Sequence, residues 1–226
     1  MLDIAWLSTQ WPTEHKDGYG DVPVALSQLS SFQRDEARPF FVFIDEKREA
    51  ADEDKLMRKL FGIEEVVMGS KLFNCYRMNV EDIPDSKLQK QYGKKLPAIF
   101  FYDAKGKEIG KVTGSKKAKT VFGKLGKLYK SFYAKGSLTK WVDTYNDKLK
   151  DMEKAEDTVA TAKKTLSGVQ ERADKKKKKT KKILKSIAEA KTAVSDAEKA
   201  FSKAKDVVAK HEAVKTKTDK KVTAAR

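Results

Sequence analysis

The sequence predicts an α/β domain followed by a long helical arm. An unbroken run of five apolar residues, Phe40 to Ile44, is typical of a strand whose two faces are both covered by helices. Further short apolar runs alternate with helical spacings up to about residue 136, which favours an α/β fold. From Leu138 to Arg226 the chain holds 25 Lys plus Arg, 14 Asp plus Glu and no Pro, and its apolar residues recur every seven positions. This second part is therefore expected to be an arm rather than a globular domain.

The head is expected to contain its elements in the order β-α-β-α-β-β-α. These are a strand at 40–44, a helix from about residue 50 that stops at Gly62, a strand at 73–80, a short helix at 85–93, a strand at 96–102, a returning strand at 108–113, and a helix whose apolar stripe spans 121–132. Strands separated by helices are expected to pair in parallel through right-handed crossovers. The turn residues at 103–107 predict that the last two strands form an antiparallel hairpin.

Four regions are predicted along the chain. Residues 1–37 are an entry segment packed on the head, and residues 38–136 are the head itself. Residues 137–213 form the arm, with a lysine-rich break at 175–182, and residues 214–226 are a basic tail.

Three stretches carry a family resemblance. They are RPFFVFID at 38–45, NCYRMNVED at 74–82 and YGKKLPAIFFYDAKGKEIGKVTG at 92–114. Together with the order of elements, they resemble the thioredoxin-like superfamily over roughly residues 36–135. The resemblance implies that Pro97 matches the family's cis-proline. It also implies a peptide or protein groove near residues 46–52 and 95–97, with Lys47, Arg48, Leu96 and Pro97 as candidate binding residues.

The chain departs from this family where the family places its two redox cysteines. The corresponding loop reads Glu46-Lys47-Arg48-Glu49-Ala50-Ala51-Asp52 and contains no sulfur. Dithiol chemistry needs one thiolate to attack a disulfide and a second thiol to release the mixed intermediate. We therefore expect a redox-inactive domain and a protein that is not an enzyme.

Cys75 is the only cysteine of the chain. It falls within a predicted strand, and a free cysteine usually behaves as a small buried hydrophobe. A monothiol enzyme that uses Cys75 is kept as an alternative. The two histidines lie far apart in sequence, so no metal site and no cofactor are expected.

Lysines form two candidate anion-binding groups. The first lies on the last helix of the head, where no acid occurs between Ser115 and Gly136; its members are Lys116, Lys117, Lys119, Lys124, Lys127 and Lys130. The second lies in the arm and consists of Lys175, Lys176, Lys177, Lys178, Lys179, Lys181 and Lys182. A patch of positive charge without counter-charges attracts polyanions such as nucleic acid. For the first group, the simpler interpretation is a solvated face opposite the apolar stripe.

The arm keeps a strict seven-residue repeat that starts with Leu138 and Trp141 and runs to Val208 and His211. Such a repeat predicts a coiled coil, because an isolated helix would drift out of it over this length. Two architectures remain open: a continuous helix zipped to another chain, or a hairpin that turns at the lysines and pairs with itself. The repeat passes through the lysine run without a slip, which favours the continuous helix.

The net charge of +16 biases the whole surface towards anionic partners without identifying them. No stretch reaches the roughly 18 consecutive apolar residues of a membrane span, and the first residues do not resemble a signal peptide. We therefore expect a cytoplasmic protein without a membrane span. The favoured function is a scaffold or adaptor that binds protein through its head and assembles through its arm. The alternative is a structural component of a nucleic-acid-containing particle.

Overall fold

The computed structural model describes residues 4–7, 13–17, 20–23, 25–27, 38–133, 136–176 and 180–213. The chain divides into two compact units. The first, called the head below, comprises Met1–Val142 and Lys215–Arg226, and the second, called the arm, comprises Asp143–Val214. Each unit is described by itself.

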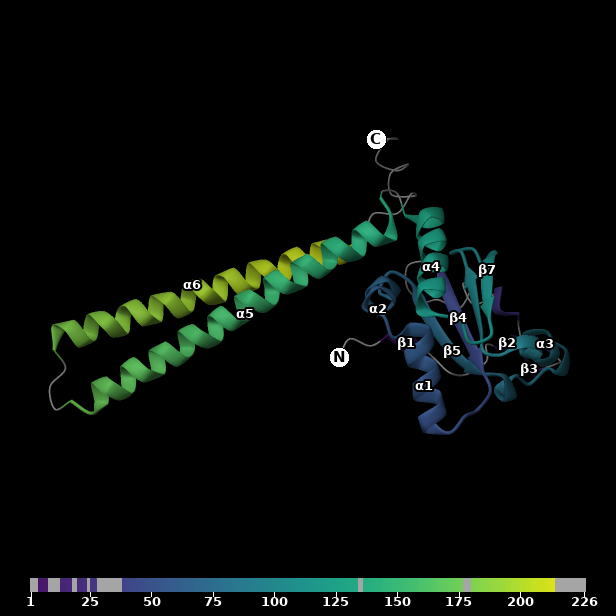
Figure 1. Ribbon diagram of the computed structural model, residues 1–226, viewed down its shortest axis with the longest axis horizontal. Helices are drawn as coiled ribbons and strands as arrows, with labels where there is room; N and C mark the ends of the chain where they lie inside the picture. The colour runs from purple at the N-terminus through teal and green to yellow at the C-terminus, as the bar shows by residue number, and fades with distance from the viewer. Residues whose placement is uncertain are drawn as a thin grey trace. The chain divides into compact units, whose positions relative to one another are not determined.

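The head is built on a five-stranded mixed sheet with the order β1-β5-β4-β6-β7 (Figure 1). Its strands are β1 (Trp6–Leu7), β4 (Phe40–Asp45), β5 (Asn74–Asn79), β6 (Ala98–Tyr102) and β7 (Glu108–Thr113). β5 runs parallel to both β1 and β4, whereas β6 runs antiparallel to both β4 and β7. A separate two-stranded antiparallel sheet pairs β2 (Thr13–Lys16) with β3 (Gly20–Pro23).

The sheet is central because β4 is buried on both faces, as its unbroken apolar run predicts. Successive side chains of a strand point to opposite faces. Phe40, Val42 and Ile44 join one core cluster, which also includes Tyr92 at the end of α3 (Ser86–Tyr92). Phe41 lies on the other face, where its ring packs on Phe61 and Phe101.

Three helices gather on that second face. They are α1 (Ala50–Phe61), α2 (Glu64–Ser70) and α4 (Ala118–Phe132), and α4 packs against both α1 and α2. α4 forms because Val121, Leu125 and Leu128 recur on one side of the helix, and all three are completely buried. Helices therefore cover both faces of the sheet, α3 on one and α1, α2 and α4 on the other.

The boundary between α1 and α2 depends on Gly62. A Cβ atom at this position would lie 2.2 Å from the carbonyl oxygen of Arg58, far inside van der Waals contact. The amide of Gly62 donates to that same carbonyl and closes the last turn of α1. The predicted helix stop at Gly62 is confirmed.

The predicted parallel pairing of the strand at 96–102 is wrong. A helix separates β5 from β6, yet β6 lies beside β4 and runs antiparallel to it. α3 has seven residues and is about 10 Å long, whereas a six-residue strand such as β5 is about 20 Å long. The helix is thus too short to return the chain along the sheet, and β6 starts at the edge where β5 ends.

One α-helix and three strands were not predicted. α2 buries all five residues from Val66 to Ser70, so it lacks the polar face that makes a helix recognisable in sequence. β1 has only two residues, and β2 and β3 lie in a stretch without a clear apolar pattern.

The peptide bond between Leu96 and Pro97 is cis, the isomer that the resemblance implies.

The arm consists of two helices, α5 (Leu138–Asp174) and α6 (Lys181–Glu212), and its compact unit begins at Asp143, within α5. Contacts between their distant ends show that they fold back on each other as a hairpin (Figure 1). The Tyr145 hydroxyl donates to a Glu212 carboxylate oxygen at 2.6 Å, and Lys163 Nζ lies 2.9 Å from Glu198 Oε1. The preference for one continuous helix is therefore wrong, and the self-paired alternative holds.

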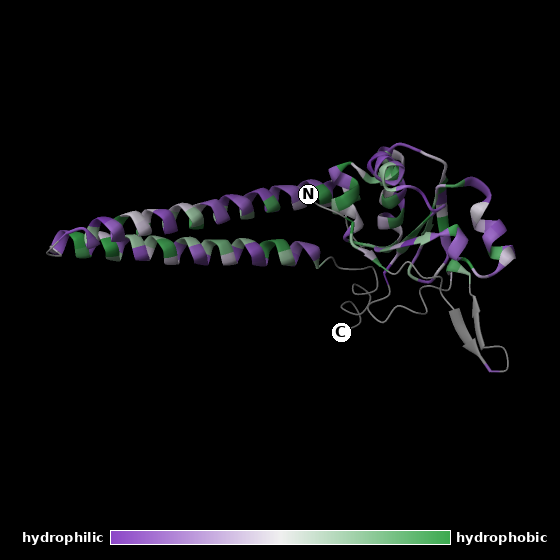
Figure 2. Ribbon diagram, turned by 90° about the horizontal axis from the view of Figure 1, so that it is seen from below, coloured by the Kyte–Doolittle hydropathy of each residue, from purple (hydrophilic) through white to green (hydrophobic). Residues whose placement is uncertain are grey.

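The seven-residue repeat marks the seam between α5 and α6. Almost every repeat position in the arm is buried or half-buried, while the positions outside the repeat are mostly exposed. The buried members are Tyr145, Ala173, Ala190, Ala197 and Val208. Figure 2 shows hydrophobic residues recurring between hydrophilic ones along both helices. Within the described residues, no helix is long and apolar enough to span a membrane.

Candidate functional site

The sequence-predicted peptide site lies at one edge of the head's sheet. Lys47 and Arg48 follow β4, and the 3-10 helix η2 (Val80–Asp82) follows β5. β4 and β5 are parallel neighbours, with Asp45 opposite Asn79, so both segments emerge at the same edge. Ile44 is paired with Ala98, which brings Pro97 to this edge as well. The fold thus collects all four predicted residues at one edge.

Acidic residues of the head engage both cations of this site. The backbone amide of Lys47 donates to the Glu81 carboxylate at 3.2 and 3.3 Å, and Lys47 Nζ lies 2.9 Å from Asp82 Oδ1. The side-chain hydrogen bond from Lys47 lowers the pKa of Asp82, and the same bond raises the pKa of Lys47. Each group stabilises the charged form of the other.

Arg48 makes a bidentate contact with a buried carboxylate. Its Nε lies 2.7 Å from Asp45 Oδ2, and its Nη2 lies 3.1 Å from Asp45 Oδ1 and 2.6 Å from a Glu46 oxygen. Asp45 is only 5% exposed, so Arg48 compensates a charge that would otherwise be buried alone. The guanidinium therefore has a structural role in this loop.

The two apolar members of the site offer little surface. Leu96 is half-buried and Pro97 is buried. Neither they nor the two cations line the cavity of the head described below. The geometry thus gives the predicted peptide site a location at the end of β4.

Cys75 lies within β5 and is buried. Its thiol donates to the carbonyl oxygens of Ser70 and Phe73, each at 3.5 Å. Burial raises the pKa of the Cys75 thiol, which keeps it protonated at neutral pH. A protonated and inaccessible thiol is a poor nucleophile, so this setting does not favour the monothiol alternative.

The predicted lysine group of the head lies in α4 and in the two residues before it, Lys116 and Lys117. Lys116, Lys117, Lys119, Lys127 and Lys130 are exposed, and Lys124 is half-buried. The buried positions of α4 face the core, so the predicted solvated face and the predicted anion patch occupy the same surface. Nothing in the geometry separates the two interpretations.

The lysines of the arm converge where α5 ends and α6 begins. Lys175, Lys176, Lys181 and Lys182 are all exposed, whereas the predicted site residues Lys177, Lys178 and Lys179 lie outside the described residues. Lys185 belongs to the same group because it is exposed and lies one turn further along α6. We call Lys175, Lys176, Lys181, Lys182 and Lys185 the lysine cluster of the arm.

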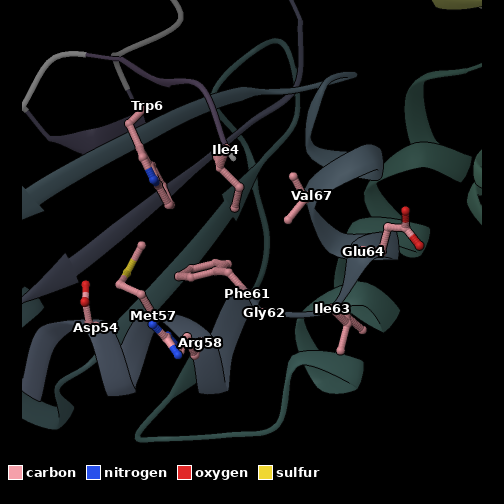
Figure 3. Close-up of a pocket in the computed structure, with 10 residues that line it drawn as sticks. All are labelled: Ile4, Trp6, Asp54, Met57, Arg58, Phe61, Gly62, Ile63, Glu64 and Val67. Carbon is pink, nitrogen blue, oxygen red and sulfur yellow. The ribbon is translucent and has the colours of Figure 1, made fainter. Parts of the chain in front are cut away.

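Sequence reasoning missed a cavity of about 620 Å³ in the head. It lies between the β1 segment, α1 and the start of α2 (Figure 3). Trp6, Met57 and Phe61 point towards a common space, and Asp54 and Arg58 lie at its border. The sequence feature that could have revealed this cavity is Trp6, an aromatic residue in a stretch whose apolar spacing predicts neither a helix nor a strand.

Within the described parts of the chain, no group of three or more His, Cys, Asp or Glu side chains is placed to hold a metal ion. No family model matches the sequence, and no curated protein matches it either.

Proposed function

We propose that this protein is a non-catalytic adaptor that binds nucleic acid through the lysine cluster at the end of its helical hairpin. The observation that carries the proposal is the convergence of exposed lysines at one end of the arm. The segment from Lys175 to Ala188 holds eight lysines and no acid. A continuous helix would spread these charges along its length, whereas the hairpin gathers them at its turn.

Asp174 directly precedes the lysine cluster, and no further acid follows it in sequence until Glu189. Glu189 is the first acid of α6, and its contact with Lys185 is a long one of 3.8 Å between exposed groups. Exposed pairs of this kind contribute little energy and release easily. Contacts between lysine side chains and phosphate groups dominate non-specific nucleic-acid binding, and exposed lysines of this kind can make them.

The head supports a binding role rather than a catalytic one. The order of the elements from β4 to α4 and the placement of α1 after β4 support the resemblance drawn from sequence, so we propose a thioredoxin-like head. The loop after β4 holds paired charges in place of redox cysteines, and the single thiol is buried. We therefore propose that the head binds a protein partner and that the arm binds nucleic acid.

The experiment compares two triple variants of the full chain with equal loss of charge. One is Lys181→Gln/Lys182→Gln/Lys185→Gln in the lysine cluster, and the matched control is Lys116→Gln/Lys117→Gln/Lys119→Gln on α4. Binding of a fluorescein-labelled oligothymidine of about 20 nucleotides is followed by fluorescence anisotropy between 50 and 200 mM salt, the range over which phosphate contacts weaken strongly.

We expect the cluster variant to bind roughly tenfold more weakly than the wild type and to lower the salt slope by about 2, because three phosphate contacts are lost. The α4 control should change binding less. Equal losses in the two variants, or wild-type binding that does not change with salt, would overturn the proposal. Binding to phosphatidylserine vesicles without binding to the oligonucleotide would also overturn it and would identify a membrane surface as the partner.

A further inference from the structure

The two edges of the helical hairpin differ in chemistry. Glu198 follows the seam residue Ala197, and its ion pair with Lys163 marks one edge. Ala193, Ala200 and Val207 each come directly before a residue of the seam. In a coiled coil this position lies on the opposite edge from Glu198. One edge is therefore charged, and the other carries an apolar row along α6.

This second edge is accessible. Ala193 and Ala200 are exposed, and Val207 is one of the few large hydrophobic residues of the chain with more than a third of its surface exposed, at 38%. α5 borders the edge with Asp151, Thr158 and Thr165, which recur at the seven-residue spacing. Asp151 pairs with Lys154 of the same helix at 3.6 Å. The hydroxyls of Thr158 and Thr165 donate to the carbonyl oxygens of Lys154 and Thr161 at 2.8 and 3.0 Å, so the helix itself partners these polar groups.

A row of charges runs beside the apolar row at the same seven-residue spacing. It reads Glu189, Asp196, Lys203, Lys210, with two acids followed by two bases, and all four residues are exposed. Glu189 and Asp196 make only long intrahelical contacts of 3.8 and 3.7 Å with Lys185 and Lys199. Within the described residues, Lys203 and Lys210 have no acidic partner in salt-bridge range.

We infer that two copies of this chain associate through this edge, with their α6 helices antiparallel about a two-fold axis beside Ala200. Reversal of the second copy places its Lys210 opposite Glu189 and its Lys203 opposite Asp196. Both pairs are centred on the same point of the helix. By symmetry each pair occurs twice, which gives four ion pairs across the contact.

The apolar row follows the same axis. In the reversed copy Val207 lies opposite Ala193, and Ala200 lies opposite its own counterpart, so each large side chain meets a small one. Small residues allow the helix axes to approach closely. A parallel arrangement would instead place acid against acid and lysine against lysine, which disfavours it.

A second copy is the occupant because the charge row is complementary to itself in reverse order. A nucleic-acid partner would be repelled by Glu189 and Asp196, and an acidic protein segment would gain from only half of the row. This inference goes beyond the proposed function and rests on residues other than the lysine cluster.

Charge reversal on the full chain tests the arrangement, with the dissociation constant measured by sedimentation equilibrium in the absence of nucleic acid. The acid-side variant is Glu189→Lys/Asp196→Lys, and the base-side variant is Lys203→Glu/Lys210→Glu. Each alone brings like charges together, and we expect its dissociation constant to rise at least about tenfold. An equimolar mixture of the two should restore association, because every contact between the two kinds of chain then joins opposite charges.

The matched control is Lys191→Glu/Lys205→Glu, which makes the same charge change as the base-side variant on the opposite edge of α6 and should leave self-association close to that of the wild type. Far-ultraviolet circular dichroism verifies that each variant keeps its helices. A wild-type chain that stays monomeric up to about millimolar concentration, the limit of weak association, would overturn the inference. A mixture that fails to restore association would do so as well.

Cross-linking locates the axis independently. With Cys75→Ser as the background, Ala200→Cys should be joined efficiently by a short bismaleimide, whereas Ser202→Cys, two residues away on another face, should not. Equal cross-linking at both positions would overturn the inference. A monomeric chain that still binds the oligonucleotide would reject only the dimer and would leave the proposed function standing.

Discussion

The predicted peptide site of the head and the lysine cluster of the arm place their charged residues in opposite ways. At the edge of the sheet, Lys47 and Arg48 are held by acids of the neighbouring segments, and Arg77 on β5 is paired with Glu53 on α1. At the end of the arm, lysines gather without acids between Asp174 and Glu189. Charges that are paired within a unit stabilise its fold, whereas charges that remain unpaired are available to a partner. The comparison assigns structural roles to Lys47 and Arg48 and is consistent with the binding role proposed for the lysine cluster of the arm.

The two units also differ in how completely they bury apolar side chains. Phe41 in β4 is fully buried and packs on three other rings, those of Trp6, Phe61 and Phe101. Phe201 in the seam of the arm is only half-buried. A hairpin of two helices leaves many of its seam residues partly in contact with water, while a sheet covered on both faces buries its central strand completely.

The largest expected effect tests this difference in burial. Phe41→Ala should lower the free energy of unfolding of the head by about 3–5 kcal/mol, and Phe201→Ala should cost the arm only about 1–2 kcal/mol. Urea unfolding is followed by tryptophan fluorescence, since Trp6 and Trp141 both belong to the head, and by circular dichroism at 222 nm, which is dominated by the helices. Similar losses for the two substitutions would contradict the contrast between the units.

A smaller effect tests whether Arg48 is structural. Arg48→Met removes the bidentate partner of the buried Asp45 carboxylate and should destabilise the head by about 1–3 kcal/mol. Arg48→Lys keeps the charge and loses the paired geometry, so it should fall between the wild type and Arg48→Met. The free energy of unfolding from urea denaturation measures both. A fully stable Arg48→Met variant would show that the guanidinium is free to bind a partner.

The smallest effect concerns the exposed pair of Lys47 and Asp82. Lys47→Ala removes the hydrogen bond that lowers the pKa of Asp82, so this pKa should rise towards its ordinary value. Because the pKa of Asp82 is lower in the folded state, the pair stabilises the fold above the ordinary pKa of an aspartate. That contribution is lost as the pH falls through the pKa of the folded state. Carboxyl titration by nuclear magnetic resonance measures the shift, and an unchanged pKa would contradict the pairing.

Sequence patterns predicted the parts of the fold that depend on local periodicity. The apolar run of β4, the amphipathic stripe of α4 and the helix stop at Gly62 each follow from neighbouring residues alone. β1 and α2 were missed because their burial depends on distant residues. Trp6, for example, packs on Phe61 of α1, and no local pattern announces that contact.

Whether the arm is one continuous helix or a hairpin could not be predicted from its repeat. A seven-residue pattern fixes which face of each helix is apolar, and the same face serves a continuous zipper or a hairpin equally well. What distinguishes them is the stability of the helix at Lys175 to Lys182, where like charges three and four residues apart repel. The helix ends before this run, and α6 begins within it.

The sequence predicted which residues belong to the candidate sites, and it did not predict the contacts that these residues make. The resemblance located Lys47, Arg48, Leu96 and Pro97 at one edge of the sheet, where the fold does collect them. The acids that engage the two cations lie in η2, at the end of β4 and in the loop that follows β4, and only the pairing of β4 with β5 brings η2 near. The lysine cluster depended on a turn whose existence the sequence left open.

The pairing of β1 with β5 has a consequence for synthesis of the chain on the ribosome. Trp6 is made early, but its partner Cys75 and the intervening strand β4 appear only later. With synthesis at roughly 5–20 residues per second, Trp6 waits several seconds in the nascent chain before the sheet can accept it. Pairing in the arm can instead begin beside the turn as soon as the start of α6 is made, and it reaches Tyr145 and Glu212, 67 residues apart, only at the end. The head has no such early starting point, because β1 cannot pair before β5 has been made.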